Sequence, residues 1–168
     1  MTKCLNQFYE KIHINHTSDD TSYIPYKNIC MMFFADWFRS PSRIGFDDVL
    51  SAVRHPTKYI LINTLPANEQ ECLIQNTVPI DTEETTVNTL LTQYEKVVRK
   101  IIVYGKNATD TTVEKKYKQL LGLGIGDVYI YSGGLFEWML LQDIYGETEF
   151  PTTKKVLDIL RYKPVTSF

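Results

Sequence analysis

The stretch that decides the fold runs from Lys100 to Asp143 and reads KIIVYGKNATDTTVEKKYKQLLGLGIGDVYIYSGGLFEWMLLQD. Residues 101–104 form a short run of apolar, mostly β-branched residues, which is typical of a strand buried on both faces. Residues 128–131 have the same character and predict a second strand. A polar loop and a helix between the two strands complete a βαβ unit, so we expect parallel strands and a right-handed crossover.

The helix of this unit has recognisable ends. Thr111 with Glu114 three residues later is a capping-box pattern, which predicts a helix start at Thr111 and an end near Leu121. The loop that enters this helix lies at the carboxyl end of the first strand. Ligands in α/β proteins usually bind at such a position, so the candidate site is the loop Gly105, Lys106, Asn107, Ala108, Thr109, Asp110 and Thr111.

The rest of the chain adds further elements to this unit. Alternation and turn signals predict strands at 43–45, 58–63 and 77–80. Helical spacing of apolar residues predicts helices at 46–53 and 81–99, the helix that begins at Leu135, and a last helix at 154–162.

Three features in this order resemble a rhodanese-like domain, the fold shared by sulfurtransferases and Cdc25-type phosphatases. They are the strand and loop at 101–111, the Gly133-Gly134 pair followed by Trp138, and the upstream strand at 59–63 with the segment 72–80. The resemblance covers roughly residues 42–143. It implies a three-layer α/β/α domain with a mainly parallel, five-stranded central sheet over residues 41–168, preceded by an N-terminal extension of residues 1–40.

The chain departs from this family where the chemistry would take place. Active members carry a nucleophilic cysteine at the end of the strand that here ends at Tyr104, and Gly105 stands in that position. The loop from Gly105 to Asp110 contains no Cys, Ser, His or Arg. Asn63 replaces the acidic residue of the family, and Thr64 and Leu65 replace its arginine. A thiolate mechanism needs the sulfur itself, so the resemblance implies a fold without the family reaction.

Cys72 is the one cysteine within the resembling region, beside the apolar pair Leu73-Ile74. We expect it to be a buried structural thiol. The alternative is a relocated nucleophile that supports sulfurtransferase or phosphatase-like chemistry. A further alternative is an oxyanion sensor, in which the amide groups of the 105–111 loop bind a small oxyanion without turnover.

Composition limits the other function classes. The 168 residues are 43% hydrophobic and carry a net charge of −2, which gives no electrostatic case for nucleic acid or an anionic membrane. Three cysteines at unrelated spacings favour neither a disulfide framework nor a zinc site, and we expect no metal and no cofactor. The default location is a cytoplasm. The run from Gly133 to Gly146, with Phe150-Pro151-Thr152, is also similar to rhodanese-like proteins of protists and large DNA viruses, and for a viral protein the expected location is the host cytoplasm or a virion.

The most apolar stretch precedes the resembling region, at residues 30–38. One interpretation is that it packs onto its own domain. The other is that it contacts a protein partner or a second copy, because Met, Phe and Trp are enriched in interface cores. The residues of this predicted partner-binding surface are Met31, Met32, Phe33, Phe34, Trp37 and Phe38. Together these observations favour a catalytically inactive rhodanese-like domain that acts as a protein-binding or structural module.

Overall fold

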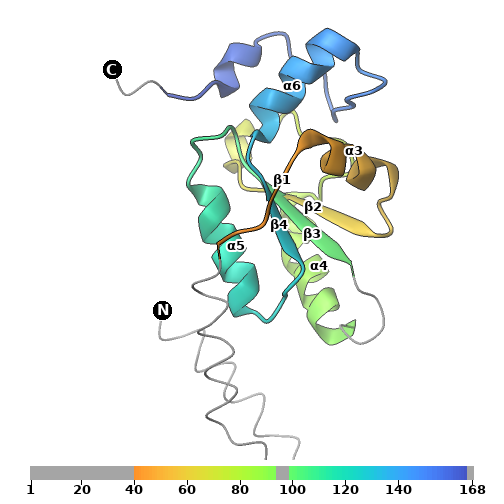
Figure 1. The fold of residues 1–168 in the computed structure, drawn as a ribbon, viewed down its shortest axis with the longest axis vertical. Coiled ribbons are helices and arrows are strands. Elements are labelled where there is room, and N and C mark those ends of the chain that lie inside the picture. The colour runs from red at the N-terminus through yellow and green to blue at the C-terminus, as the bar shows by residue number, and fades with distance from the viewer. Residues whose placement is uncertain (1–39, 94–98, 166–168) are drawn as a thin grey trace, which may run out of the picture. The chain divides into compact units, whose positions relative to one another are not determined.

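The computed structural model describes residues 40–93 and 99–165. Within them the sheet has four strands in the order β1-β4-β3-β2, and every neighbouring pair is parallel. Parallel neighbours need crossovers, and helices provide them (Figure 1). The strands are β1 (Arg43–Ile44), β2 (Tyr59–Asn63), β3 (Lys100–Tyr104) and β4 (Val128–Tyr131).

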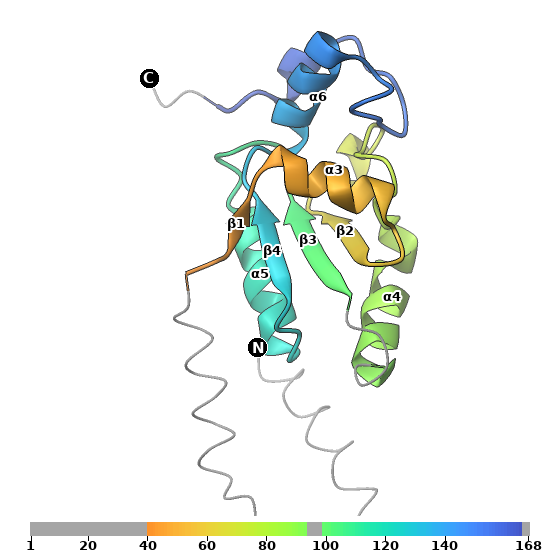
Figure 2. The same cartoon turned by 45° about the vertical axis from the view of Figure 1, so that its right-hand side comes forward.

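In the part of the chain that the structure describes, four α-helices pack around this sheet. Helices α4 and α5 lie on one face and α3 on the other, while α6 lies beyond the carboxyl ends of the strands and packs into the same core cluster as α3 (Figure 2). The helices are α3 (Phe46–Arg54), α4 (Ile80–Gln93), α5 (Thr112–Gly122) and α6 (Gly134–Tyr145), with 3₁₀ turns η1 (Ala67–Glu69) and η2 (Ile159–Tyr162).

The strands are apolar on both faces because each face has its own helical layer. Successive side chains of a strand point to opposite sides, so β2 and β3 supply residues to two separate cores. Toward α4 and α5 they present Ile60, Ile62, Ile101 and Val103, and toward α3 and α6 they present Leu61, Ile102 and Tyr104. The predicted α/β class, with a parallel sheet between two helical layers, is therefore confirmed.

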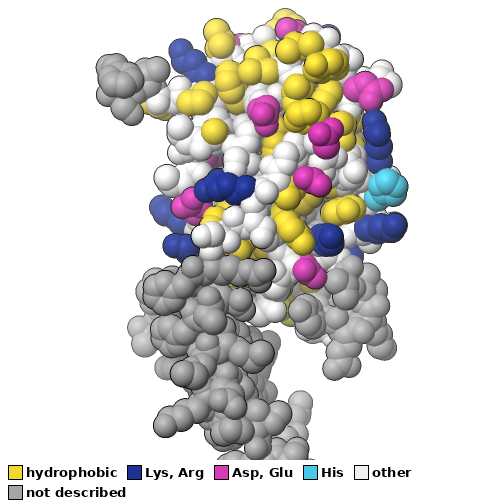
Figure 3. Space-filling model, viewed as in Figure 1, with side chains coloured by type: hydrophobic (Ala, Val, Ile, Leu, Met, Phe, Trp, Pro, Cys, Tyr) yellow, Lys and Arg dark blue, Asp and Glu magenta, His cyan; other side chains and the backbone are white. Residues whose placement is uncertain are grey.

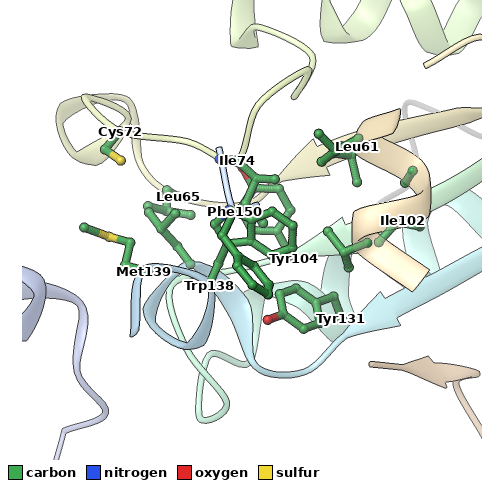
Figure 4. Packing of buried hydrophobic residues seen from close by; sticks show 14 of the residues in the cluster. Leu61, Leu65, Cys72, Ile74, Ile102, Tyr104, Tyr131, Trp138, Met139 and Phe150 are labelled. Atoms are coloured by element: carbon green, nitrogen blue, oxygen red, sulfur yellow. Dashed lines mark hydrogen bonds between the residues drawn. The ribbon is translucent and has the colours of Figure 1, made fainter. Parts of the chain in front are cut away.

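An aromatic cluster forms the centre of the α3 and α6 side (Figure 4). The Trp138 ring meets Tyr131 edge-on at a centroid distance of 6.4 Å and Phe150 at 5.1 Å. Trp138 also donates a hydrogen bond from Nε1 to the carbonyl oxygen of Pro151, at 3.2 Å. The tryptophan of the Gly-Gly segment thus attaches the C-terminal segment to the core, with its one polar atom paired.

The sheet differs from the prediction in its number of strands. The segment predicted as a fifth strand, 77–80, forms a single parallel bridge between Thr77 and Leu61 in the described part of the chain. Val78 still donates its N–H to the Leu61 carbonyl at 2.9 Å. Pro79 has no N–H to continue the ladder, and α4 begins at the next residue.

The predicted helix at 154–162 is wrong over most of its length. Backbone groups just before it pair with the segment that follows Cys72: Gln75 donates to the Pro151 carbonyl at 3.1 Å, and Thr153 donates to the Leu73 carbonyl at 2.8 Å. The Thr153 hydroxyl also accepts a hydrogen bond from the Leu73 N–H at 3.0 Å, so this side chain is not free to cap a helix, and within residues 154–162 only η2 forms, as a short 3₁₀ turn.

The predicted partner-binding residues Met31, Met32, Phe33, Phe34, Trp37 and Phe38 lie outside the described residues. In the part of the chain that the structure describes, no helix is both long enough and apolar enough to cross a bilayer. Within the same residues, no three His, Cys, Asp or Glu side chains converge as metal ligands.

Candidate functional site

The 105–111 loop lies at the carboxyl end of β3, beside the end of β2. The Thr64 N–H donates to the Tyr104 carbonyl at 3.0 Å, and this bond extends the β2–β3 pairing to the start of the loop. The hydroxyls of Thr64 and Thr112 are 2.8 Å apart and join the end of β2 to the first residue of α5. The end of β2, where residues 63–65 depart from the rhodanese-like pattern, therefore lies beside the 105–111 loop.

Helix α6 holds the first half of the loop. The Leu135 N–H donates to the Gly105 carbonyl at 2.9 Å, and the Phe136 N–H donates to the Lys106 carbonyl at 3.0 Å. Gly134 has a φ of +64°, and a Cβ on it would lie 2.7 Å from the Gly105 oxygen. The second glycine of the pair is thus needed twice, for its backbone conformation and for the close approach of the loop.

The Asp110 carboxylate occupies the inside of the loop. Its Oδ2 accepts a hydrogen bond from the Lys106 N–H at 2.9 Å, and its Oδ1 accepts one from the Thr112 N–H, also at 2.9 Å. A loop that curls around a helix N-terminus offers its amides to an anion, and here the chain supplies that anion itself.

This arrangement corrects the capping-box prediction. The Thr111 side chain makes no capping hydrogen bond, whereas Asp110 bonds to the first N–H of α5. Its negative charge also lies at the positive end of the helix dipole. Asp is among the strongest N-cap residues, so the signal for Asp110 was present in the sequence one position before Thr111.

Asn107 fixes the middle of the loop from inside the fold. It is 7% exposed, and its Nδ2 donates to the Tyr162 carbonyl at 2.8 Å. Its Oδ1 accepts hydrogen bonds from the N–H and the hydroxyl of Thr109, at 3.1 and 2.8 Å. One buried side chain therefore joins the loop to η2 and pairs a loop amide.

The cationic side chains around the loop are paired with carboxylates. Lys106 Nζ lies 2.9 Å from a carboxylate oxygen of Glu69, with both side chains partly buried. Arg43, which sequence reasoning did not connect with the loop, pairs with Glu114 at 2.7 Å and donates to the Ser132 hydroxyl at 2.8 Å. Its parallel register beside β4 places it there, a long-range pairing without a local sequence signal.

The space beside Gly105 is already filled. A Cβ on Gly105 would lie 2.4 Å from Asp110 Oδ2 and 2.6 Å from a methyl carbon of Val113. The depression at the loop, which Arg43 and Ser132 also line, has a volume of about 80 Å³. Small-molecule sites usually enclose about 300–1,000 Å³. The loop thus has no room at Gly105 for a nucleophilic side chain and only a small depression beside it.

Tyr104, the residue before Gly105, points into the core. Its hydroxyl lies 2.7 Å from the Thr77 hydroxyl and accepts a hydrogen bond from the Ile74 N–H at 3.2 Å. Burial raises the pKa of this phenol well above its usual range, against the hydrogen bonds, which lower it. Tyr104 therefore acts as a neutral bridge between β3 and the 74–77 segment.

Cys72 is a buried thiol within the same core cluster as Leu65 and Met139 (Figure 4). Its side chain is fully buried, and this burial raises the pKa of the thiol, although hydrogen bonding to Thr152 and to the Lys154 backbone acts in the opposite direction. A nucleophilic cysteine needs a lowered pKa and access to solvent, and Cys72 has neither property.

Among known proteins, the chain is similar in fold to several solved structures, at low sequence identity. No family model matches the chain, and no curated protein matches it. Among solved structures, a full-length protein from Lactobacillus plantarum is 18% identical with a TM-score of 0.45, over 77% of this chain and 98% of that one.

Two other solved structures carry the name of an activity. A single-domain sulfurtransferase from Saccharomyces cerevisiae is 17% identical with a TM-score of 0.45, over 61% of this chain and 92% of that one. An As-Sb reductase from Leishmania major is 15% identical with a TM-score of 0.42, over 64% and 81%. Identities of 15–18% and TM-scores of 0.42–0.45 carry no argument about function, which must come from the residues and contacts of this chain.

Proposed function

We propose that this chain is a catalytically inactive rhodanese-like domain that works as a protein-binding or structural module. The observation that carries the proposal is the pair Gly105 and Asp110. Glycine stands where the resemblance places the nucleophile, and the Asp110 carboxylate fills the space that a side chain there would need. The carboxylate also occupies amides that would otherwise bind a substrate oxyanion.

The alternatives need groups that this site does not offer. Sulfur transfer through Cys72 requires a thiolate, and burial favours the protonated thiol. Oxyanion sensing at the loop requires the anion to displace Asp110 from two amides and to approach a carboxylate. A free, buried thiol fits a reducing compartment, so we place the module in a cytoplasm.

A binding role is supported by apolar side chains at the surface of α6 and the C-terminal segment. Figure 3 shows apolar side chains gathered over this part of the domain. Ile144 is 70% exposed and Leu157 is 91% exposed. The other large apolar side chains exposed there are Leu140, Tyr145, Leu160 and Val165. Exposed apolar groups of this size commonly mark interaction sites. The apolar segment 31–38 remains the second predicted contact surface.

The catalytic half of the proposal is tested by intact-mass measurement after incubation with thiosulfate. We expect no added sulfur atom on the full-length chain. A persulfide that maps to Cys72 and disappears in Cys72→Ser would favour the relocated nucleophile instead.

The binding half is tested by crosslinking the full-length chain in extract of its native cells, with Ile144→Asp and Trp37→Asp as variants. Thr89→Asp, on the exposed surface of α4, is the control for added charge. We expect a discrete crosslinked species that the control retains and at least one of the two variants loses. A crosslink pattern identical in all four proteins would contradict binding through these surfaces.

A further inference from the structure

The exposed apolar side chains of the described residues are concentrated in one segment. Of the seven large apolar side chains exposed in residues 40–93 and 99–165, six lie between residues 140 and 165. The seventh, Ile80, begins α4, which lies on the opposite face of the sheet from α3 (Figure 2). We call the six the C-terminal surface, and Figure 3 shows the apolar area there. They are Leu140, Ile144, Tyr145, Leu157, Leu160 and Val165. Single surface apolar residues need no explanation, but a concentration of this kind does.

The domain holds this surface in place. Gln142 on α6 donates a hydrogen bond from Nε2 to the Phe150 carbonyl at 2.6 Å, and this bond fixes the turn that follows the helix. The buried Asn107 donates to the Tyr162 carbonyl at 2.8 Å, and this bond fixes η2. A preformed surface loses little conformational entropy when it binds a partner.

The C-terminal surface has an acidic end. Asp143 lies in the last turn of α6 and Glu147 lies two residues beyond the helix, and both are exposed without an ion pair to a described residue. The last turn of α6 contains no basic residue, and the nearby Arg54 is already paired with Glu149 at 3.0 Å. Because a helix C-terminus carries partial negative charge and is stabilised by cations, this end lacks a positive partner.

Unpaired lysines lie on the other part of the same surface. Lys155 and Lys163 are exposed and form no ion pair with a described residue, whereas the two basic side chains beside them are both paired with Glu71. Asp158 is the acid between these lysines, so the unpaired groups here leave one net positive charge. The two ends of the surface therefore carry opposite signs.

We propose that the C-terminal surface binds a second copy of this chain through a twofold interface. In such an interface the same surface of both copies meets, so the apolar side chains of α6 pack together while the acidic end of each chain faces the lysines of the other. A surface of one sign would repel its own copy, whereas this one is complementary to itself. The proposal rests on the proposed binding function and names the partner of that surface.

Sedimentation of the full-length protein over a range of concentrations tests the proposal. We expect a monomer–dimer equilibrium with a dissociation constant on the order of micromolar, as for a small interface. Ile144→Asp places a charge on the surface of each copy and should raise this constant at least about tenfold. Ile80→Asp makes the same change at the exposed apolar residue outside the surface and should dimerise as the wild type does.

Charge reversal tests the twofold pairing itself. One variant carries Asp143→Lys with Glu147→Lys, and the other carries Lys155→Glu with Lys163→Glu. Each variant alone should sediment as a monomer where the wild type is a dimer, because both ends of its surface then carry the same sign. An equimolar mixture of the two should dimerise again, since each positive surface meets a negative one.

Three results would overturn the proposal: a wild type that stays monomeric well above micromolar concentration, a dimer that Ile144→Asp retains, or reversed variants that do not recover on mixing. The crosslinking experiment in cell extract then separates this failure from that of the proposed function. If the wild type is monomeric but Ile144→Asp still loses its crosslinked species, the surface binds a different protein and only the second copy is refuted. If the crosslink pattern is also unchanged, binding through this surface is refuted as well.

Discussion

The most informative perturbation is Gly105→Ala, because it adds one carbon at the position where the structure leaves no space. The new Cβ would lie 2.4 Å from Asp110 Oδ2 and 2.6 Å from the Val113 side chain. Real side chains do not approach so closely, so either Asp110 or the backbone must move. Overpacking of this kind costs about 1–3 kcal/mol.

The Asp110 carboxylate cannot move without losing its bonds to the Lys106 and Thr112 amides. Loss of an N-terminal cap costs about 1 kcal/mol. The smaller conformational freedom of Ala in the unfolded chain returns about 0.4–1 kcal/mol. We therefore expect Gly105→Ala to lower the free energy of unfolding by about 2–3 kcal/mol and Asp110→Ala by about 1–2 kcal/mol.

The double variant separates this account from a general sensitivity of the loop. If Gly105→Ala already displaces the carboxylate, removing Asp110 as well adds little. The double variant should then be more stable than the sum of the single effects predicts, by about 1 kcal/mol or more.

Urea unfolding of the four proteins measures this coupling, with Gly126→Ala as control, since a Cβ there would meet nothing within 4 Å. Additive effects, within about 0.5 kcal/mol, would refute the claim that Asp110 fills the space beside Gly105.

Three further predictions concern the glycine that contacts the loop and two residues of the core cluster behind it. Gly134→Ala should destabilise the domain by about 2 kcal/mol or more in urea unfolding, because its φ is +64° and its Cβ would meet the Gly105 carbonyl at 2.7 Å. A loss below 0.5 kcal/mol would contradict the close approach. Iodoacetamide should alkylate Cys72 at least about tenfold more slowly in the native protein than in urea between pH 7 and 9, since its raised pKa keeps the thiol protonated. Peptide mapping measures both rates, and equal rates would show an accessible thiolate. Tyr104→Phe should cost about 1–3 kcal/mol, because it leaves the buried Ile74 N–H without its acceptor and removes the bond between the Tyr104 and Thr77 hydroxyls. A stability equal to that of the wild type in urea would contradict this bridging role.

Most of the fold was predictable because its signals are local. The apolar runs of β2, β3 and β4 each lie between two helical layers, so buried strands could be recognised from composition alone. The fifth strand and the last helix were predicted wrongly where long-range backbone pairing decides the conformation. Thr77 pairs for a single residue before Pro79, and the 151–153 segment pairs with 73–75.

The place of the 105–111 loop in the fold was predictable, but its internal contacts were not. The order of strand, polar loop and helix located residues 105–111, and the absence of a nucleophile there could be seen directly in the sequence. The sequence could not show that Arg43 lies beside the loop, because this contact joins an edge strand to residues about 70–90 positions away. The Asp110 bonds are local, to Lys106 and Thr112, and an N-cap role for this aspartate was the available signal that the capping-box interpretation at Thr111 passed over.

The central claim is that the loop has no nucleophile and no space for one, and thiosulfate:cyanide sulfurtransferase activity tests it most directly. The full-length wild type and Gly105→Cys are assayed beside heat-denatured protein, with thiocyanate as the measured product. The account predicts blank rates for both proteins, because the wild type lacks the sulfur and the new cysteine would collide with Asp110 and Val113. Wild-type turnover that rises in proportion to protein concentration would contradict the account, and activity gained by Gly105→Cys alone would show that the space beside Gly105 is open.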